Sequence, residues 1–582
     1  MKSTAFQIFA SILLIFAYLV TMRIQPEKTE GDMASTIPHT ILLYLEQKNG
    51  GNDLQRFAAS RFGKSLESID FMAVAQEIGL QDDALSGMKT FFDLYEKVKN
   101  DPLLHKIMGK KVAFALMQPV DSLPATSVLE FLQENTLIVA KPENMRQWIK
   151  NGENTLGDGG QDVILSTTQY GTHRILRILL GNQPFSIVLL KGFAIMSRNE
   201  KHVRRCIDTV DGEMPDLTTD LDFQEIRRQM SVPDSFVYVP METMRRFISS
   251  IAEGDYSFPG KNLLLKGMQS TTGFNGFGYV VQRTEERIEK KILIRFNRQE
   301  VNEFARHYIE TPPVASPMLS LATKNPMFYY WSNTLNFKNV SLYVEDVAEN
   351  DPRLAEFLSR LKKVTGKDIS STLSLIGKET GIIVEEGPRD ALFPFPLGIC
   401  FFRIEKMAEF RNVIDKLLQT YDLPLKEEVY RSAWFRYWSR GPQDGLLPLY
   451  GFWRDYFFVG NSTMLLRRVI DTHGSRFSMA DVAAARKIDP GIDGKNNSVS
   501  YINNVQLISM VENFLEVLGT FVAIEDRETA MKIRIVLKKV VNPLLDGATM
   551  YRASSARSHV HADMLTIDSI TDVSGNSSTS RE

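Results

Sequence analysis

The sequence has little of what catalytic and metal-binding sites are usually built from. It holds two cysteines and eight scattered histidines among 582 residues. We find no His-Glu-x-x-His, no paired Cys-x-x-Cys, no P-loop and no Gly-x-Gly-x-x-Gly after a strand. A Gly-x-Ser-x-Gly nucleophile elbow is also missing. We therefore predict no catalytic residue, no metal site and no cofactor, and we lean towards a protein that is not an enzyme.

The chain also lacks a strong charge of either sign. Its formal net charge is −2, which argues against a general nucleic-acid binder, because such proteins usually carry a basic face. Arginine pairs such as Arg204-Arg205 and Arg467-Arg468 are better explained as solvated faces of helices. We expect no nucleic-acid partner.

The two cysteines, Cys206 and Cys400, both lie in apolar sequence and are interpreted as small core residues. A disulfide between them depends on whether the fold brings them together. The cysteine count therefore leaves the redox compartment open.

One long apolar run stands at the N-terminus. Residues 5–22 are almost uncharged, and a helix of roughly 18–20 residues can just cross a bilayer. A cleaved signal peptide is the alternative, but the run lacks the small-residue exit typical of one. We predict an uncleaved signal-anchor that contacts the lipid bilayer through residues 5–22. The predicted localisation is single-pass in the inner membrane, with the body in the periplasm and a cytoplasmic body as the alternative.

A stretch of the chain occurs twice. Residues 193–209 and 456–472 align without a gap, and both end in Arg-Arg-x-Ile-Asp-Thr. Each predicts a short strand, a polar turn and an amphipathic helix. The same offset carries on to the apolar runs at 235–239 and 498–502 and to the helices after them. We infer an internal duplication. Asp208 and Asp471, which recur in the two copies, are interpreted as helix-end or charge-pairing residues.

Because strands cluster in hairpins, we predict an α+β fold class: an N-terminal transmembrane helix followed by two tandem related units of antiparallel sheet plus helices. A polar stretch after the apolar run and the sequence Thr-Pro-Pro-Val-Ala-Ser-Pro at 311–317 mark boundaries. The predicted divisions are a signal-anchor at 1–23, a linker at 24–38, a first α+β repeat at 39–311, a linker at 312–324, a second α+β repeat at 325–570 and a flexible tail at 571–582.

Two surfaces are candidates for function. An aromatic hairpin region contains Trp434, Trp438, Tyr450 and Trp453, which we name as a candidate partner or ligand surface. The alternative is that both faces of this hairpin are covered inside the body. His559 and His561 share one strand face with Arg557 and Asp563, so a metal or anion site is conceivable there. A solvated strand face is the preferred interpretation.

Residues 109–117, 191–208 and 373–402, the last with its Phe-Pro-Phe-Pro, carry a family resemblance. The chain resembles bacterial membrane-anchored proteins that are catalogued only as a domain of unknown function. The resemblance implies an N-terminal hydrophobic helix and a large extracytoplasmic α+β body. It implies no catalytic residues.

These observations favour a membrane-tethered, non-enzymatic envelope protein that binds a protein, lipid or polymer partner through its duplicated body. One alternative is a periplasmic hydrolase whose site is assembled from distant residues, which would require convergent acids or a Ser/His pair in a pocket. Another is a carrier of hydrophobic ligands with a cavity near residues 434–453.

Overall fold

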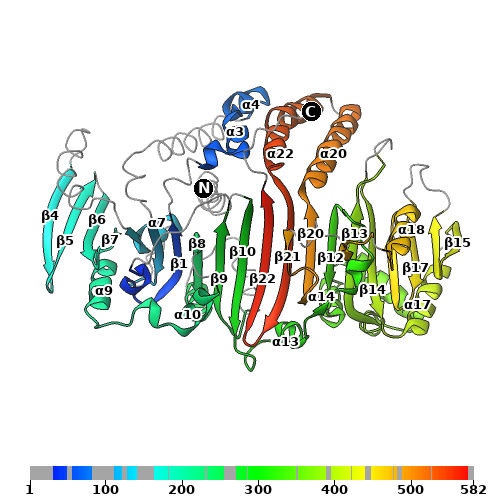
Figure 1. The fold of residues 1–582 in the computed structure, drawn as a ribbon, viewed down its shortest axis with the longest axis horizontal. Helices are drawn as coiled ribbons and strands as arrows, with labels where there is room; N and C mark the ends of the chain where they lie inside the picture. Colours follow the sequence, from blue (N-terminus) through cyan, green and yellow to red (C-terminus); the bar gives the residue numbers. More distant parts are fainter. Residues whose placement is uncertain are drawn as a thin grey trace. The chain divides into compact units, whose positions relative to one another are not determined.

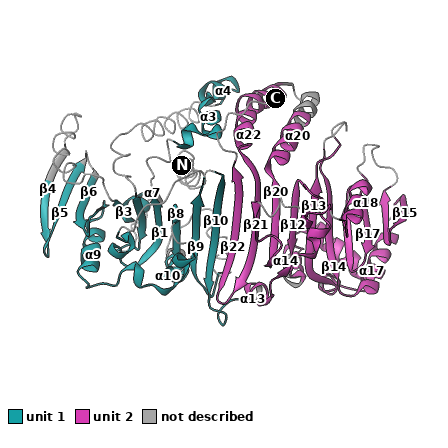
Figure 2. Ribbon diagram, viewed as in Figure 1, with its two compact units in different colours: residues 1–302, 575–582 teal, residues 303–574 magenta. Residues whose placement is uncertain are grey.

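The chain forms two compact units in a computed structural model (Figure 2). Unit 1 comprises residues 1–302 and 575–582, and unit 2 comprises residues 303–574. The structure describes residues 31–48, 56–80, 111–120, 128–140, 163–180, 183–229, 233–253, 271–284, 286–348, 351–388, 395–420, 423–438, 447–475, 477–481, 488–525 and 527–573.

The described part of unit 1 is mainly strands with short helices between them (Figure 1). Its strands are β1 (Ile41–Lys48), β2 (Lys111–Met117), β3 (Thr136–Ala140), β4 (Val163–Tyr170), β5 (His173–Leu180), β6 (Gln183–Leu190), β7 (Phe193–Ser197), β8 (Ser235–Pro240), β9 (Phe274–Arg283) and β10 (Arg287–Phe296). Its helices are η1 (Met33–Thr36), α3 (Arg61–Glu67), α4 (Phe71–Glu77), α7 (Val128–Asn135), α9 (Glu200–Val210), η2 (Leu217–Thr219), α10 (Leu221–Arg228) and α11 (Met241–Glu253).

Unit 2 repeats this pattern with more helix. Its strands are β11 (Val314–Ala315), β12 (Phe328–Ser332), β13 (Ile376–Glu385), β14 (Leu397–Ile404), β15 (Leu425–Tyr430), β16 (Ala433–Trp438), β17 (Leu449–Trp453), β18 (Tyr456–Gly460), β19 (Lys495–Asn496), β20 (Ser498–Asn503), β21 (Tyr551–His561) and β22 (Met564–Val573). Its helices are α13 (Glu303–Glu310), η3 (Pro317–Ser320), α14 (Phe337–Ala348), α15 (Pro352–Thr365), α16 (Ile369–Leu373), α17 (Met407–Gln419), α18 (Thr463–Thr472), η4 (Met479–Asp481), α20 (Asn504–Glu525), α21 (Arg527–Val536), η5 (Leu537–Val541) and α22 (Asn542–Ala548).

The two units share one strand order. In unit 1 the antiparallel pairings run β4-β5-β6-β7-β3-β2-β1-β8-β9-β10. In unit 2 they run β15-β16-β17-β18-β14-β13-β12-β20-β21-β22. Each strand of unit 1 therefore has a counterpart in unit 2, and positions in the two units can be compared one by one.

A tyrosine contact recurs in both units. The hydroxyl of Tyr170, the last residue of β4, donates to Asp208 in α9 over 3.0 Å. The hydroxyl of Tyr430, the last residue of β15, donates to Asp471 in α18 over 2.9 Å. These hydrogen bonds to the carboxylates raise the pKa of both tyrosines, because they stabilise the neutral phenol. The repeated Asp thus fixes the outer hairpin of each sheet to the helix of the duplicated stretch.

A second repeated contact lies where β8 and β20 begin. Asp234 accepts a hydrogen bond from the backbone N–H of Arg283 over 2.6 Å. Asn497 accepts one from the backbone N–H of Val560 over 3.1 Å. Asp234 and Asn497 precede equivalent strands, so a short side chain with an oxygen acceptor, a carboxylate in one unit and an amide in the other, satisfies a backbone N–H of the neighbouring strand.

Helices cover both faces of the unit 2 sheet. Phe401, Phe435 and Phe458 are fully buried in the larger core, into which α18 also packs. Phe402 and Phe452 point to the other face, where they contact a smaller cluster around Phe410 of α17. Successive strand residues point to opposite faces, so the aromatic residues of these strands divide between the two cores.

The predicted fold class is wrong as stated. Residues 5–22, on which the transmembrane prediction depends, lie outside the described residues. Within the described ranges no helix is long and apolar enough to cross a membrane; α20, the longest helix there, carries polar residues such as Glu512 and Glu516. The described fold is instead dominated by large antiparallel sheet, because each hairpin adds its strands to the edge of an existing ladder.

The same finding corrects the predicted single-pass inner-membrane localisation, which required a membrane-spanning helix. The predicted linker at 24–38 also contains ordered structure. Met33 and Ala34 in η1 and the following Ile37 are fully buried, and Asp32 caps the helix by accepting from the N–H of Ala34. The polar composition of residues 24–38 led to the prediction of a linker, but its few apolar residues are those that reach the core.

Candidate functional site

The four aromatic residues predicted as one surface do not lie together. Trp434, Trp438 and Tyr450 share the face of the sheet that α17 covers, since Trp434 lies opposite Phe452 and Arg436 opposite Tyr450. Trp453 points to the opposite face, where it is buried in the larger core at 4% exposure. Trp438, at 38%, is the most exposed of the four.

Trp434 is enclosed by its neighbours rather than presented to a partner. Its ring stacks on Phe452 with centroids 5.8 Å apart, and the guanidinium of Arg411 lies 4.2 Å from its centroid. Two hydrogen bonds lower the pKa of Glu427 below its ordinary value: the larger effect comes from the Trp434 indole and the smaller from Arg436. Trp434 and Phe452 therefore belong to a small second core under α17, and the guanidinium of Arg411 packs on the indole ring.

Trp453 packs edge-on against His473, with ring centroids 5.6 Å apart. Burial, and then the charge of Arg454, lower the pKa of His473. The imidazole of an unfolded chain has a pKa of about 6.5, so the unfolded state binds a proton at a higher pH than the folded state does. The free energy of unfolding of unit 2 should therefore fall as the pH drops below that value. We expect Arg454→Gln to raise the pKa of His473 in an NMR titration and to flatten this pH dependence. An unchanged pKa in that variant would show that Arg454 does not act on the imidazole.

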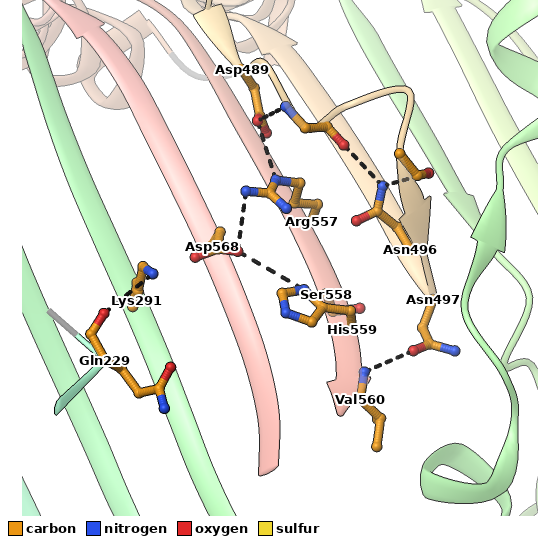
Figure 3. Close-up of polar contacts among 12 residues, drawn as sticks. Gln229, Lys291, Asp489, Asn496, Asn497, Arg557, Ser558, His559, Val560 and Asp568 are labelled. Atoms are coloured by element: carbon orange, nitrogen blue, oxygen red, sulfur yellow. Dashed lines mark hydrogen bonds and ion pairs between the residues drawn. The ribbon is translucent and has the colours of Figure 1, made fainter. Parts of the chain in front are cut away.

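A polar cluster in unit 2 surrounds Asp489, whose carboxylate is fully buried (Figure 3). Asp489 is 0% exposed and accepts from Arg557 Nε over 3.2 Å, from Ser555 Oγ over 3.0 Å and from the N–H of Gly491 over 2.9 Å. Arg557 also contacts Asp568 on β22 through Nη2 over 3.2 Å. The guanidinium therefore joins the segment before β19 to both C-terminal strands.

The duplicated unit fills the same place with apolar atoms. By strand pairing and by the constant offset of the repeat, Asp489 corresponds to Ile226 in α10, and Ser555 corresponds to Gly278 in β9. Ile226 is fully buried, and its side chain lies where a Cβ on Gly278 would stand. The shared fold therefore does not require a buried ion pair at this position, and its presence is particular to unit 2.

The arrangement of this cluster does not form a Ser–His–Asp relay. Ser555 donates to Asp489 and lies four residues from His559 along β21, which is about 13 Å in a strand. His559 Nδ1 instead lies 3.9 Å from Asp568 Oδ2. The cluster thus lends no support to the hydrolase alternative.

The histidine face considered in the sequence is only partly assembled. His559 shares Asp568 with Arg557, whereas His561 and Asp563 are exposed at the β21–β22 turn. In the described part of the chain no group of three or more His, Cys, Asp or Glu side chains could hold a metal ion. Cys206 and Cys400 are both free thiols, and burial raises the pKa of each.

The outermost strands, β4 in unit 1 and β15 in unit 2, differ in charge. Among the described strands, β4 pairs only with β5 and β15 only with β16. Such an edge presents backbone N–H and C=O groups that can pair with another chain. Since Tyr170 and Tyr430 close equivalent hairpins, residues 166–168 (Ser-Thr-Thr) correspond to residues 426–428 (Lys-Glu-Glu).

The edge strand β15 is protected by charge. Glu427 is paired with Arg436 over 3.0 Å, and Glu428 is paired with Arg467. No residue of β4 is charged, and Ser166, Thr167 and Gln169 are exposed. Charged edge residues are a common means of blocking strand addition. The edge of β15 carries such residues, and the edge of β4 carries none.

Sequence reasoning missed both the buried Asp489 cluster and the contrast between the edges. A signal for each was present in the position-by-position comparison of the two copies: Ile226 against Asp489, and Ser-Thr-Thr against Lys-Glu-Glu.

Comparisons with known proteins give little further information. No family model and no curated protein matches the chain. Among solved structures it is similar to crystal form IV of TP0453, at 10% identity and a TM-score of 0.24, over 46% of this chain and 81% of that one. Crystal form III of TP0453 gives 9% identity and a TM-score of 0.23, over 50% of this chain and 91% of that one. TM-scores this low support no statement about fold or function, and the resemblance to membrane-anchored proteins stays a prediction.

Proposed function

We propose that this chain is a non-enzymatic binding protein that takes up an extended segment of a protein partner at edge strand β4 of unit 1. The observation that carries the proposal is the contrast between two equivalent edges, uncharged Ser-Thr-Thr at 166–168 and charged Lys-Glu-Glu at 426–428. An added strand gains affinity from main-chain hydrogen bonds and specificity from alternate side chains.

The side chains of β4 suit strand addition on both faces. Ser166, Thr167 and Gln169 are exposed, and none carries a charge that a partner would have to desolvate. The hairpin that presents them is held by the hydrogen bond from Tyr170 to Asp208. A partner strand would therefore meet an edge that is already ordered, which lowers the entropic penalty of binding.

The test uses a photo-crosslinking amino acid at Gln169 of the full chain, with the same group at its counterpart Val429 as the matched control. Val429 is 65% exposed, so poor accessibility would not explain a missing crosslink at the control position. We expect a crosslinked polypeptide from position 169 and not from position 429 in extracts of the cells that make the protein.

The crosslink must also depend on the edge itself. Replacing Ser166, Thr167 and Thr168 with Lys, Glu and Glu gives β4 the charges of β15 and should abolish the product. Equal crosslinking from positions 169 and 429, or a product that survives the replacement, would contradict strand addition at β4.

A further inference from the structure

We infer that Arg205 of α9 binds the carboxylate of a ligand, supplied by a small organic acid or by a peptide. The ligand carboxylate takes the role that Glu385 plays for the equivalent arginine of unit 2. The inference goes beyond the proposed function, because it does not require strand addition at β4.

The duplicated stretch carries an arginine pair in each unit, and three of these four guanidinium groups hold a carboxylate. The three ion pairs are Arg204 with Glu200 over 2.7 Å, Arg467 with Glu428 over 2.5 Å and Arg468 with Glu385 over 2.9 Å. Arg205 is the exception. Its Nη1 is buried and has no hydrogen-bond partner among the residues that the structure describes.

The arginine without a partner is the more buried of the two equivalent ones. The side chain of Arg468 is 45% exposed, so water could solvate it even without Glu385. Arg205 is half-buried, and water does not reach its Nη1. A buried N–H without a partner carries a desolvation penalty, and such groups in folded proteins are usually satisfied by another group. The stronger need for an acceptor therefore lies in unit 1.

Unit 1 has no carboxylate at the position of Glu385. Strand pairing makes Met117, the last residue of β2, the counterpart of Glu385, the last residue of β13. Both residues are buried, at 0% and 7% exposure. The methionine side chain is about as long as glutamate, but its thioether is uncharged and a weak acceptor. The duplication has thus kept the arginine on the helix and lost its carboxylate on the strand.

A carboxylate from outside suits the group that remains. A guanidinium can donate two parallel hydrogen bonds to one carboxylate, and such charge-assisted bonds are about twice as strong as neutral ones. Arg205 is only half-buried, so a ligand can approach it from solvent. Met117 has an unbranched side chain with several rotatable bonds, which can adjust to a neighbouring ligand.

Isothermal titration calorimetry on the full chain tests this site with two probes, acetate and an N-acetylated trialanine peptide with a free C-terminal carboxylate. Acetamide and the amidated peptide are the uncharged controls. We expect the wild type to bind a carboxylate probe and neither amide. Arg205→Gln should raise the dissociation constant at least about tenfold, because it removes the charge-assisted bonds. Arg204→Gln is the matched control and should leave binding unchanged, since Arg204 already holds Glu200.

A second set of variants moves the carboxylate instead of the arginine. Met117→Glu supplies an internal carboxylate as in unit 2 and should abolish binding of the probe, whereas Met117→Gln has the same length without the charge and should retain it. Glu385→Met removes the internal carboxylate of unit 2. Added to Arg205→Gln, it should restore binding through Arg468.

The outcomes decide both the site and the source of the carboxylate. Binding of acetate as tight as that of the peptide indicates a small organic acid, and tighter binding of the peptide indicates a peptide carboxylate. A wild type that binds neither probe, or that binds the amides equally well, overturns the inference. Binding that survives both Arg205→Gln and Met117→Glu also overturns it, because the probe then occupies another place.

Discussion

Replacing Asp489 with isoleucine is expected to destabilise unit 2 by about 3 kcal/mol, even though isoleucine is the residue found at the equivalent place in unit 1. Asp489 is fully buried and accepts hydrogen bonds from Arg557, Ser555 and Gly491. Its loss leaves the guanidinium against apolar atoms on that side. The effect should lie at the lower end for a broken buried pair, because Arg557 is about a quarter exposed and keeps Asp568.

Urea unfolding followed by tryptophan fluorescence measures this effect, since four of the five tryptophans lie in unit 2. The control transplants the whole set of unit 1 residues: Asp489→Ile, Ser555→Gly, Arg557→Val and Asp568→Lys. This variant should return to within about 1 kcal/mol of the wild type, because it removes both partners of the buried ion pair and puts isoleucine and valine in their place, and replacing a whole buried ion pair with apolar residues is often neutral. Two results would show that the sites of Asp489 and Ile226 are not equivalent. One is an Asp489→Ile variant as stable as the wild type, and the other is a fourfold variant as unstable as Asp489→Ile.

Replacing Gly451 with valine is expected to have a similarly large effect, a loss of about 3 kcal/mol. A Cβ at Gly451 would lie 2.3 Å from the carbonyl oxygen of Trp434 and 2.6 Å from both Phe435 Cβ and Phe458 Cζ. Phe435 and Phe458 lie directly opposite Gly451 on the neighbouring strands, and the Cβ of the first and the ring of the second occupy the space of its missing side chain. The same unfolding experiment measures the loss.

The counterpart of Gly451 in unit 1 is Val188, which is buried opposite Ile195. Gly451→Val should therefore recover part of its loss when Phe435 and Phe458 are also changed to isoleucine. Recovery should be incomplete, since the Trp434 carbonyl belongs to the backbone and isoleucine at position 435 keeps the Cβ that lies 2.6 Å away. If Gly451→Val unfolds like the wild type, the aromatic residues of this hairpin do not fill the space that the structure assigns to them.

Local patterns in the sequence were enough to predict individual hairpins. The alternating runs at 277–296 indicate a hairpin and pair as β9 with β10, and those around residues 433–453 pair as β16 with β17. Alternation also puts Trp434 and Trp438 on one face of β16, because that relation lies within a single strand.

Relations between distant residues could not be predicted in this way. Trp453 was grouped with Trp434 although it faces the other core, because the phase of β17 relative to β16 depends on their pairing register. Asp489 and Arg557 are far apart in sequence, and only the addition of β21 to β20 brings them within 3.2 Å. The apolar run at 5–22 suggested a transmembrane fold that the described residues do not support.

The most direct test of the central claim, that the charge of the edge strand decides where a partner strand pairs, is to exchange the two edges in one chain. The variant carries Lys-Glu-Glu at 166–168 and Ser-Thr-Thr at 426–428, with the photo-crosslinking amino acid either at position 169 or at position 429. We expect the crosslinked polypeptide to form from position 429 in the exchanged chain and no longer from position 169. Continued pairing through β4 in the exchanged chain, or no pairing at either edge, would contradict it.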